Sequence, residues 1–390
     1  MYNLYKEWYD AAKYGTKCES LRQYRDIVNK HINLSFHHPK KDQCPVCHSY
    51  KNGPVTSEGK INFDNHMKNK NLTRSLKEKD KRDSQNNAKI FCATFDLQKV
   101  LLSPSGEVSL FYYCKRLKVH NLSVFDIGNL TGTCYVWNEQ IAMKGSNEVA
   151  SCIYDIMKLK RSEGCDDFRF WSDNCTGQNR NRIVFFMYLY AAKELNINIK
   201  HTFLEKGHTQ NEGDSIHATI ERAAKYKSIY TPSEWSSLIR WAKTKGTPYS
   251  VIDVTQNMIY DFKKMQTNAC FNWTKNSEGE KIIWSKIKQI RVSRHEINVL
   301  FYKCDLSEDA VESHVKIVNT LVRTRRQMTD RSEIPLQVAY HQLLPIQPSK
   351  KKDLLDLCRK NIIPPLYHGY YESLVTSNDA ILMNESDNEN

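Results

Sequence analysis

The stretch KIFCATFDLQKV (89–100) has the pattern of an apolar β-strand that ends at an acidic residue, Asp96. A second strand ends in the same way within DFRFWSDNCTGQN (167–179), at Asp173. The segment HTFLEKGHTQNEGDSIHATIERA (201–223) predicts a further strand and then a helix that begins near Asp214. Carboxylates at the C-terminal ends of parallel strands converge on one crevice. The three segments therefore predict an α/β fold with a shared acidic site.

Between residues 89 and 230 the hydrophobic pattern predicts a regular series of elements. In chain order we expect strands at 89–97, in two alternating runs within 107–126 (VSLFYYCKR and KVHNLSVFD) and at 133–139, a helix at 147–161, a strand at 168–172, a helix at 182–195, a strand at 197–204 and a helix at 211–226. A meander followed by βα units predicts a mixed five-stranded sheet with helices on both faces, the order that a ribonuclease-H-like fold requires.

The remaining segments are expected to form smaller units around this domain (89–230). They are an N-terminal helical region with a C-x-x-C pair that resembles a zinc knuckle (1–60), a basic helix (61–88), a small α+β C-terminal extension (231–375) and a disordered acidic tail (376–390).

Composition is typical of a soluble protein, and its basic excess is compatible either with a polyanionic partner or with a solvated surface mildly enriched in lysine. The 390 residues include 57 Lys and Arg against 44 Asp and Glu, a net charge of +13, and nucleic acid is the usual partner of such a chain. No apolar run approaches the roughly 18 residues of a membrane span. The N-terminus lacks the apolar core of a signal peptide, so the twelve cysteines are expected to be reduced. Residence in the nucleus follows only from the expected DNA substrate and the basic clusters.

The predicted acidic site has the chemistry of a divalent metal centre. If the strands ending at Asp96 and Asp173 are parallel neighbours, their carboxylates lie side by side, and their repulsion favours a bound cation. Hard cations such as Mg²⁺ or Mn²⁺ take oxygen ligands. Two such ions about 3.5–4 Å apart activate a nucleophile and stabilise a leaving oxygen. Each aspartate alone is also compatible with an ordinary turn or cap.

The sequence leaves the identity of the remaining metal ligands undecided. Asp214, His217 and Glu221 fall on one face of their helix, and Asp214 is favoured over Glu221 because it lies nearest the strand ends. Glu148 is compatible with a fourth ligand, although a carboxylate that stabilises a helix N-terminus is the simpler interpretation. His208 follows a strand and is suited either to orienting a scissile phosphate or to a structural hydrogen bond.

Two further groups of residues each have more than one interpretation. Gln178 and Asn179 follow Asp173 closely, which is compatible with contacts to a phosphate or a base, or with helix capping. Cys44 and Cys47 form a C-x-x-C pair that supplies half of a tetrahedral zinc site. A redox pair and two free thiols are the alternatives. Spacing does not fix the other half of a zinc site, for which the nearby candidates are His48, His37, His38 and Cys18.

Four strings carry a resemblance to a known family. They are an SDNC-x-GQN block (Ser172–Asn179), a GHT-x-x-x-x-DS-x-H-x-x-IE block (Gly207–Glu221), an FDLQ-x-V-L strand (Phe95–Leu101) and a PKKD-x-C-x-x-C segment (Pro39–Cys47). Together with WNEQIAMKGSNEV and KKKDLLDLC, they resemble uncharacterised transposase-like proteins of animal mobile elements, over about residues 22–375. The resemblance implies a ribonuclease-H-like DD(E/D) enzyme, or a domesticated relative of one.

The resemblance assigns Asp96, Asp173 and Asp214 as the catalytic acids. It carries over His208, His217 and Glu221 as motif residues without a role. Proteins of this kind are often longer at the N-terminus, so a truncated or decayed copy without its DNA-end-recognition module is one interpretation.

The sequence therefore predicts metal-dependent cleavage and transfer of DNA strands, as in a transposase or integrase, with two Mg²⁺ or Mn²⁺ ions and a structural Zn²⁺. The alternative is a catalytically silent, domesticated DNA-binding or interaction protein. A ribonuclease would use the same acids. DNA is the expected partner, either transposon ends or non-specific sequence, no membrane is expected, and self-association is left open.

Overall fold

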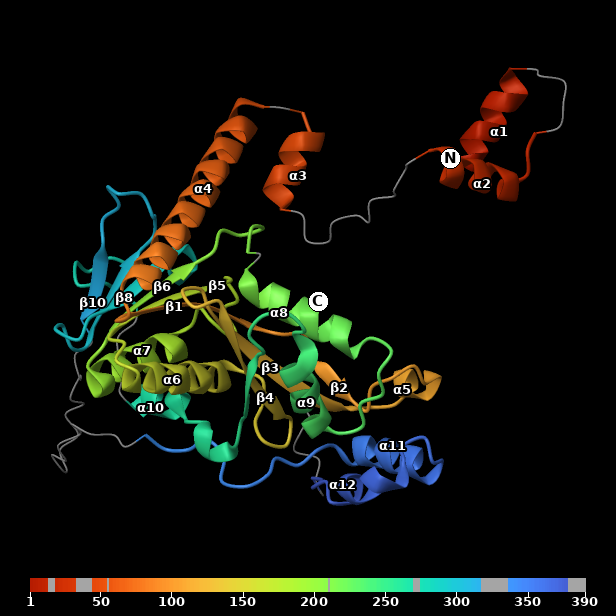
Figure 1. Ribbon diagram of the computed structural model, residues 1–390. Helices are drawn as coiled ribbons and strands as arrows, with labels where there is room; N and C mark the ends of the chain where they lie inside the picture. The colour runs from red at the N-terminus through yellow and green to blue at the C-terminus, as the bar shows by residue number, and fades with distance from the viewer. Residues whose placement is uncertain are drawn as a thin grey trace.

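The computed structural model describes residues 1–12, 18–32, 44–54, 56–209, 211–268, 274–316 and 336–377. The described part of the chain is built around one mixed sheet (Figure 1). Its strands are β1 (Ile90–Leu97), β2 (Leu101–Ser103), β3 (Leu117–Asp126), β4 (Thr131–Asn138), β5 (Asp167–Ser172), β6 (Asn198–Phe203), β7 (Ser250–Asp253), β8 (Gln289–Val292), β9 (Val299–Lys303) and β10 (Ser313–Lys316).

The helices occupy the N-terminal region, the connections between strands and the C-terminal region. They are α1 (Tyr2–Ala11), α2 (Leu21–His31), α3 (Pro45–Asn52), α4 (Ser57–Asn86), α5 (Ser109–Tyr113), α6 (Ser146–Ser162), α7 (Arg182–Leu195), α8 (Glu212–Ala224), α9 (Pro232–Ala242), α10 (Phe262–Asn268), α11 (Pro348–Arg359) and α12 (His368–Glu372), with 3₁₀ turns η1 (Gln256–Met258), η2 (Trp284–Lys286) and η3 (Pro365–Tyr367). Among the described helices, no helix has both the length and the hydrophobicity of a membrane-spanning segment.

The strand order across the sheet is β10-β9-β8-β6-β5-β1-β3-β4-β7, and β2 pairs with β3. β1 lies at the centre, antiparallel to β3 and parallel to β5. The β1–β5 register runs from Ile90 opposite Asp167 to Thr94 opposite Trp171. The prediction that these two strands are parallel neighbours is confirmed. Asp96 lies near the end of β1, opposite Ser123 of β3, and Asp173 directly follows β5, so both aspartates lie at the same end of these two strands.

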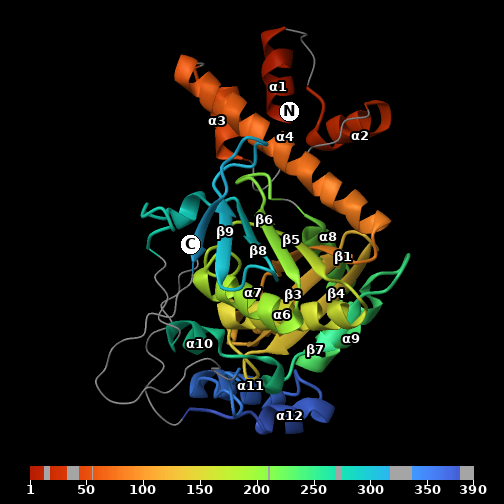
Figure 2. The same ribbon diagram turned by 90° about the vertical axis from the view of Figure 1, so that its left-hand side faces the viewer.

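Side chains of β1 alternate between two cores because successive residues of a strand point to opposite faces. Phe91, Ala93 and Phe95 are buried in the larger core, which includes residues of α6 and α7. Cys92 and Asp96 point to the opposite face. Figure 2 shows α6 and α7 covering the first face, with α10 packed against them, while α8 and α9 lie on the other side of the sheet. Helices therefore cover both faces, as predicted.

The long helix α4 is held on the second face by a buried carboxylate. Asp80 accepts hydrogen bonds from Arg169 (3.0 Å), from Lys200 (2.6 Å) and from the indole of Trp171 (3.1 Å). These partners belong to β5 and β6, so the ionic cluster ties α4 to the centre of the sheet. Buried charges persist only when they are paired in this way.

The prediction of a strand over the run VSLFYYCKR is wrong at the centre of the run. Residues Ser109–Tyr113 form the short helix α5. Phe111 is buried in a separate core with Leu354 and Tyr371 of the C-terminal helices, whereas Tyr112 and Tyr113 are exposed. Phe111 packs on a segment distant in the chain, which no local sequence pattern encodes. This packing overrides the alternating polar and apolar pattern of the run.

The predicted five-stranded sheet is also too small, because the sheet has ten strands. The predicted α+β C-terminal extension (231–375) contributes strands to the central sheet. Its strand β7 pairs in parallel with β4, and β8 pairs antiparallel with β6, followed by β9 and β10. An unpaired strand edge leaves backbone donors and acceptors unsatisfied, and these strands cover both edges of the predicted sheet. Most of the predicted acidic tail (378–390) lies outside the described residues.

Candidate functional site

Three predicted site residues meet on the α8 face of the sheet. One ligand atom each of Asp96, Asp214 and His217 lies within 4.8 Å of the others. Asp96 lies at the end of β1, and the other two lie one turn apart at the start of α8. A strand end and a helix N-terminus therefore present two carboxylates and an imidazole to one point, a donor set that suits a divalent cation.

A glycine lets α8 approach β1 closely enough for this meeting. A Cβ atom placed on Gly213 would lie 3.0 Å from the Cβ of Asp96 and 2.7 Å from Oδ1 of Asn211. Asn211 begins α8: its side chain accepts a hydrogen bond from the backbone of Gly213 (2.6 Å), and Asp214 Oδ2 accepts one from the Asn211 backbone (2.8 Å). Asp214 thus also acts in a capping box.

His217 is buried, and a contact with Ser123 of β3 orients its imidazole. Its Nε2 lies 3.1 Å from the hydroxyl of Ser123, and its Nδ1 lies 3.8 Å from Asp96. Burial lowers the pKa of His217 to about 4, against a smaller opposing effect of Asp214. The imidazole is therefore neutral at physiological pH. A proton on Nε2, donated to Ser123, leaves the Nδ1 lone pair facing the two carboxylates.

Among the three residues, Asp96 is the one whose ionised form is destabilised by its surroundings. Burial raises its pKa to about 7, and the charges of Asp173 and Asp214 add to the shift. The carboxylate is thus held near other negative groups, with too little solvent to offset them. A cation bound here would relieve this repulsion.

Asp173 lies beside the cluster but outside the group that meets within 4.8 Å. Its Oδ1 accepts hydrogen bonds from the backbone of Cys175 (3.0 Å) and from the side chain of Asn179 (2.6 Å). Asn179 is fully buried, so it positions the aspartate rather than an external phosphate or base. Gln178 is only partly buried.

The structure does not bring the other candidate acids to this point. Glu221 is exposed on α8. Glu148, in the first turn of α6, is buried and accepts a hydrogen bond from Tyr340 (2.6 Å). Its position agrees with the simpler interpretation, a carboxylate at a helix N-terminus.

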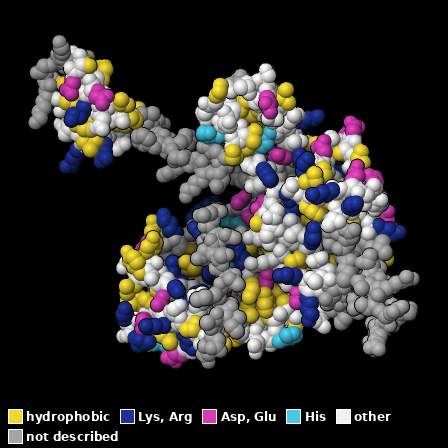
Figure 3. Space-filling model, turned by 180° about the vertical axis from the view of Figure 1, so that it is seen from behind, with side chains coloured by type: hydrophobic (Ala, Val, Ile, Leu, Met, Phe, Trp, Pro, Cys, Tyr) yellow, Lys and Arg dark blue, Asp and Glu magenta, His cyan; other side chains and the backbone are white. Residues whose placement is uncertain are grey.

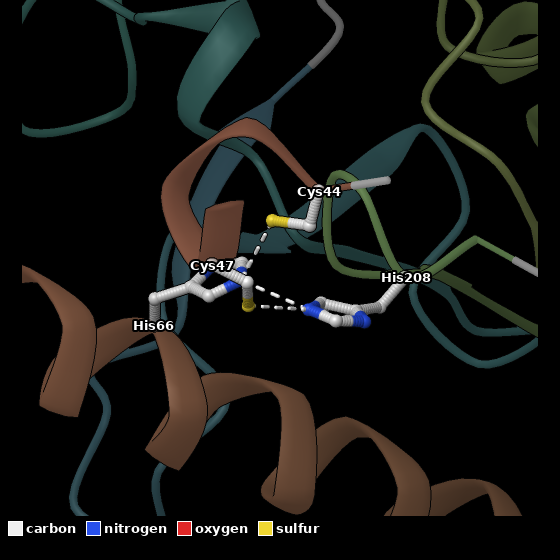
Figure 4. A group of neighbouring side chains, drawn as sticks. All are labelled: Cys44, Cys47, His66 and His208. Atoms are coloured by element: carbon white, nitrogen blue, oxygen red, sulfur yellow. Dashed lines mark hydrogen bonds between the residues drawn. The ribbon is translucent and has the colours of Figure 1, made fainter. Parts of the chain in front are cut away.

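A second group of donors contains the C-x-x-C pair. Cys44 and Cys47 at the start of α3 meet His66 of α4 and His208 of the loop after β6, and one ligand atom of each lies within 4.8 Å of the others (Figure 4). Cys44 Sγ lies 3.2 Å from His66 Nε2, Cys47 Sγ lies 3.4 Å from His208 Nε2, and the two Nε2 atoms are 3.0 Å apart.

This cluster changes two expectations. His208, considered for orienting a phosphate, has its Nε2 among the thiols. His66 was not recognised, because its helix showed only a basic pattern and no fixed spacing links a C-x-x-C pair to a histidine on a neighbouring helix. Of the other candidate partners, His48 is exposed and contacts Asn52, and Cys18 is outside the cluster. His37 and His38 lie outside the described residues.

A groove of about 250 Å³ runs between α4 and the loop that leads into α8. Lys70, Arg74, Lys77 and Lys81 line it from α4, at spacings that place them on one face of the helix. Glu205 and His208 line it from the loop and Glu212 from the first residue of α8, and Lys77 pairs with Glu212 at 2.6 Å. The groove therefore joins the region of the Cys/His cluster to the start of the helix that carries Asp214.

Comparison with known proteins gives a family model without an assigned role. A domain of unknown function, DUF7869, matches residues 113–293, less than half of the chain. The match runs from the end of α5 to just beyond β8 and includes Asp173, His208, Asp214 and His217. Asp96, Cys44, Cys47 and His66 precede it. No curated protein and no solved structure matches the chain. The sequence of the matched domain thus holds only part of each cluster.

Proposed function

We propose that this protein is a metal-dependent nuclease of the transposase or integrase type, which cleaves and joins DNA strands at the carboxylate cluster. The observation that carries the proposal is the convergence of Asp96, Asp214 and His217, with Asp173 close enough to contribute to the raised pKa of Asp96. The meander β1–β3–β4 followed by the parallel strands β5 and β6 is the order that a ribonuclease-H-like domain requires, and it supports the same conclusion.

The chemistry would follow the two-metal scheme. Asp96, Asp214 and His217, with Asp173 beside them, would hold Mg²⁺ or Mn²⁺, and such ions would supply activation of a water nucleophile and stabilisation of the leaving oxygen. Water attacks the phosphorus, the bond to the leaving oxygen breaks, and a free hydroxyl remains on the cut strand. In strand transfer, such a hydroxyl replaces water as the nucleophile.

The groove beside α4 supports a nucleic-acid substrate. Its basic stripe (Lys70, Arg74, Lys77 and Lys81) offers cations at the spacing of one helix face, next to the loop that leads to Asp214. Cations arranged along a groove bind the phosphate backbone without regard to sequence. Figure 3, which views the molecule from behind the view of Figure 1, shows Lys and Arg side chains interspersed with acidic ones, so the net charge is not gathered into one patch on this face. A DNA substrate places the protein in the nucleus.

A second function is favoured by a different observation. Asp214 and Asp173 each make local hydrogen bonds, in a helix cap and a turn, and these would hold the acids in place without any metal. A domesticated protein that binds DNA through α4 and has lost turnover would keep these contacts.

Nicking of supercoiled plasmid by the purified chain in Mn²⁺ separates the two functions. We expect the wild type to nick and Asp96→Asn to reduce the rate by at least about 100-fold, since it removes a ligand anion. Asp309→Asn, at an exposed position in the loop after β9, is the matched control and should nick normally. If wild type and Asp96→Asn bind DNA equally and neither cuts, the binding function stands. The same assay on RNA and RNA–DNA hybrids tests for a ribonuclease.

A further inference from the structure

We propose that Cys44, Cys47, His66 and His208 form a structural zinc site that fastens α3 and α4 to the loop preceding α8. The site does not depend on the proposed nuclease activity. Cys44 and Cys47 come from the start of α3, His66 comes from α4, and His208 comes from the loop after β6, so one ion would join segments far apart in the sequence.

The donor separations fit one tetrahedral ion. Bonds of about 2.3 Å to sulfur and about 2.0–2.1 Å to nitrogen place tetrahedral donors roughly 3.3–3.8 Å apart. The observed separations are 3.2 Å between Cys44 Sγ and His66 Nε2, 3.4 Å between Cys47 Sγ and His208 Nε2 and 3.0 Å between the two Nε2 atoms. The Cys47–His208 separation lies within this range and the other two are slightly shorter, so a small expansion around an ion would complete the geometry.

The donor set and its surroundings are those of a closed site. Two thiols and two imidazoles are the Cys₂His₂ set of structural zinc centres, in which protein atoms fill all four positions. Cys44 and His66 are buried, at 5% and 8% exposure. Nδ1 of His66 faces the Glu205 carboxylate at 3.5 Å, which directs Nε2 toward the sulfur atoms. Such a carboxylate partner orients metal-bound histidines.

Gly207 allows the loop to reach the thiols. Its φ is +74°, in the left-handed region, and an added Cβ would lie 2.7 Å from both Cβ and Sγ of Cys44. Glycine accepts both constraints because it has no side chain. The Gly-His pair at 207–208 is therefore explained as a close approach followed by a ligand.

The alternatives explain less of this arrangement. A redox pair requires only Cys44 and Cys47 and gives no reason for the two imidazoles. Two free thiols would not require two histidine Nε2 atoms, from elements far apart in the chain, to meet 3.0 Å from each other. A zinc ion accounts for all four positions. Because Glu205 and His208 also line the groove beside α4, the ion would fix one wall of the groove against the other.

Metal content and cobalt spectroscopy of the purified full chain test the site. We expect about one zinc per chain, and a cobalt-exchanged protein with the strong visible bands of tetrahedral coordination and a thiolate-to-cobalt charge-transfer band. Cys44→Ser and His208→Ala should lose both signals. His208→Cys should keep the metal with an altered spectrum, which shows that a loss in other variants is not simple misfolding. Glu205→Gln should weaken zinc affinity by about 10-fold.

Two controls separate this site from the carboxylate cluster. His48→Ala, which changes the exposed histidine beside Cys47, should keep stoichiometric zinc. Asp96→Asn should also keep zinc and the tetrahedral cobalt spectrum even though nicking is lost. A chain purified without zinc that gives only an octahedral cobalt spectrum, or a His208→Ala variant that retains zinc and the wild-type spectrum, would overturn the proposal.

Discussion

At the residue scale, Asp96 links the stability of the protein to pH. Its pKa of about 7 lies above the ordinary value of 3.8, so between these pH values the folded chain keeps a proton that the unfolded chain has released. Folding stability contributed by this group is therefore present in full below about pH 4, and it is lost as the pH rises through 7.

Asp96→Asn should consequently stabilise the protein above pH 7 in buffer free of Mg²⁺ and Mn²⁺. We expect about 2 kcal/mol, less than the whole pKa shift converts to, because the side chain keeps some contact with solvent. Thermal unfolding at pH 5 and pH 8 measures the difference, which should be smaller at pH 5. Mn²⁺ should stabilise the wild type and leave the variant unchanged. A variant no more stable than wild type at pH 8 would show that Asp96 is not electrostatically strained.

The two clusters differ in how much of each the sequence revealed. Asp96 and Asp214 were found because strand ends and helix starts leave a local pattern, and the rule for parallel strands brings such positions together. The sequence did not predict His66 or the position of His208, because these ligands come from elements that are distant in the chain and meet only in the folded protein. Their meeting depends on the angle of α4 against the sheet, which no local spacing encodes.

At the scale of elements, the basic stripe on α4 should carry the salt-sensitive part of DNA binding. Replacing Lys70, Arg74 and Lys81 by glutamine removes three cations from the groove and leaves the Lys77–Glu212 pair in place. We expect weaker binding to any sequence, and a log–log salt slope shallower by about 1 for each cation that contacts phosphate. Fluorescence anisotropy at several salt concentrations gives the slope.

The same helix supplies the matched control. Lys60, Lys68 and Lys79 are exposed on α4 and do not line the groove. Replacing these three by glutamine makes the same change in net charge and should alter the slope much less. Equal losses in both triple variants would mean that net charge, and not the groove, binds DNA.

Helices with a strong hydrophobic periodicity in their sequence were predicted well. α6 and α7 follow the helical pattern and its caps, and α7 begins where Asn181 accepts hydrogen bonds from Ile183 and Val184. α5 was missed because an alternating run is equally compatible with a short helix when its one buried residue packs on a distant segment. The β strands after residue 250 are short, and their pairing with β4 and β6 is set by the sheet edges and not by their own sequence.

At the scale of the whole molecule, the matched range 113–293 should not fold alone. It contains β3, β4 and β7 on one side of β1 and β5, β6 and β8 on the other side. It lacks β1 itself, which pairs with both β3 and β5. We expect a fragment of residues 113–293 to lack a cooperative thermal transition, measured by circular dichroism. A fragment of residues 44–377 should retain one. A cooperative transition in the shorter fragment would show that β3 and β5 can pair without β1.

The central position of β1 also bears on how the chain assembles during synthesis. β1 leaves the ribosome well before β5, and only its β3 edge can be satisfied by nearby sequence. Its other edge must wait until the αβ segments that follow have emerged. An exposed, apolar strand edge during that interval invites pairing with other chains, so nascent copies of this protein are expected to need a chaperone until β5 arrives.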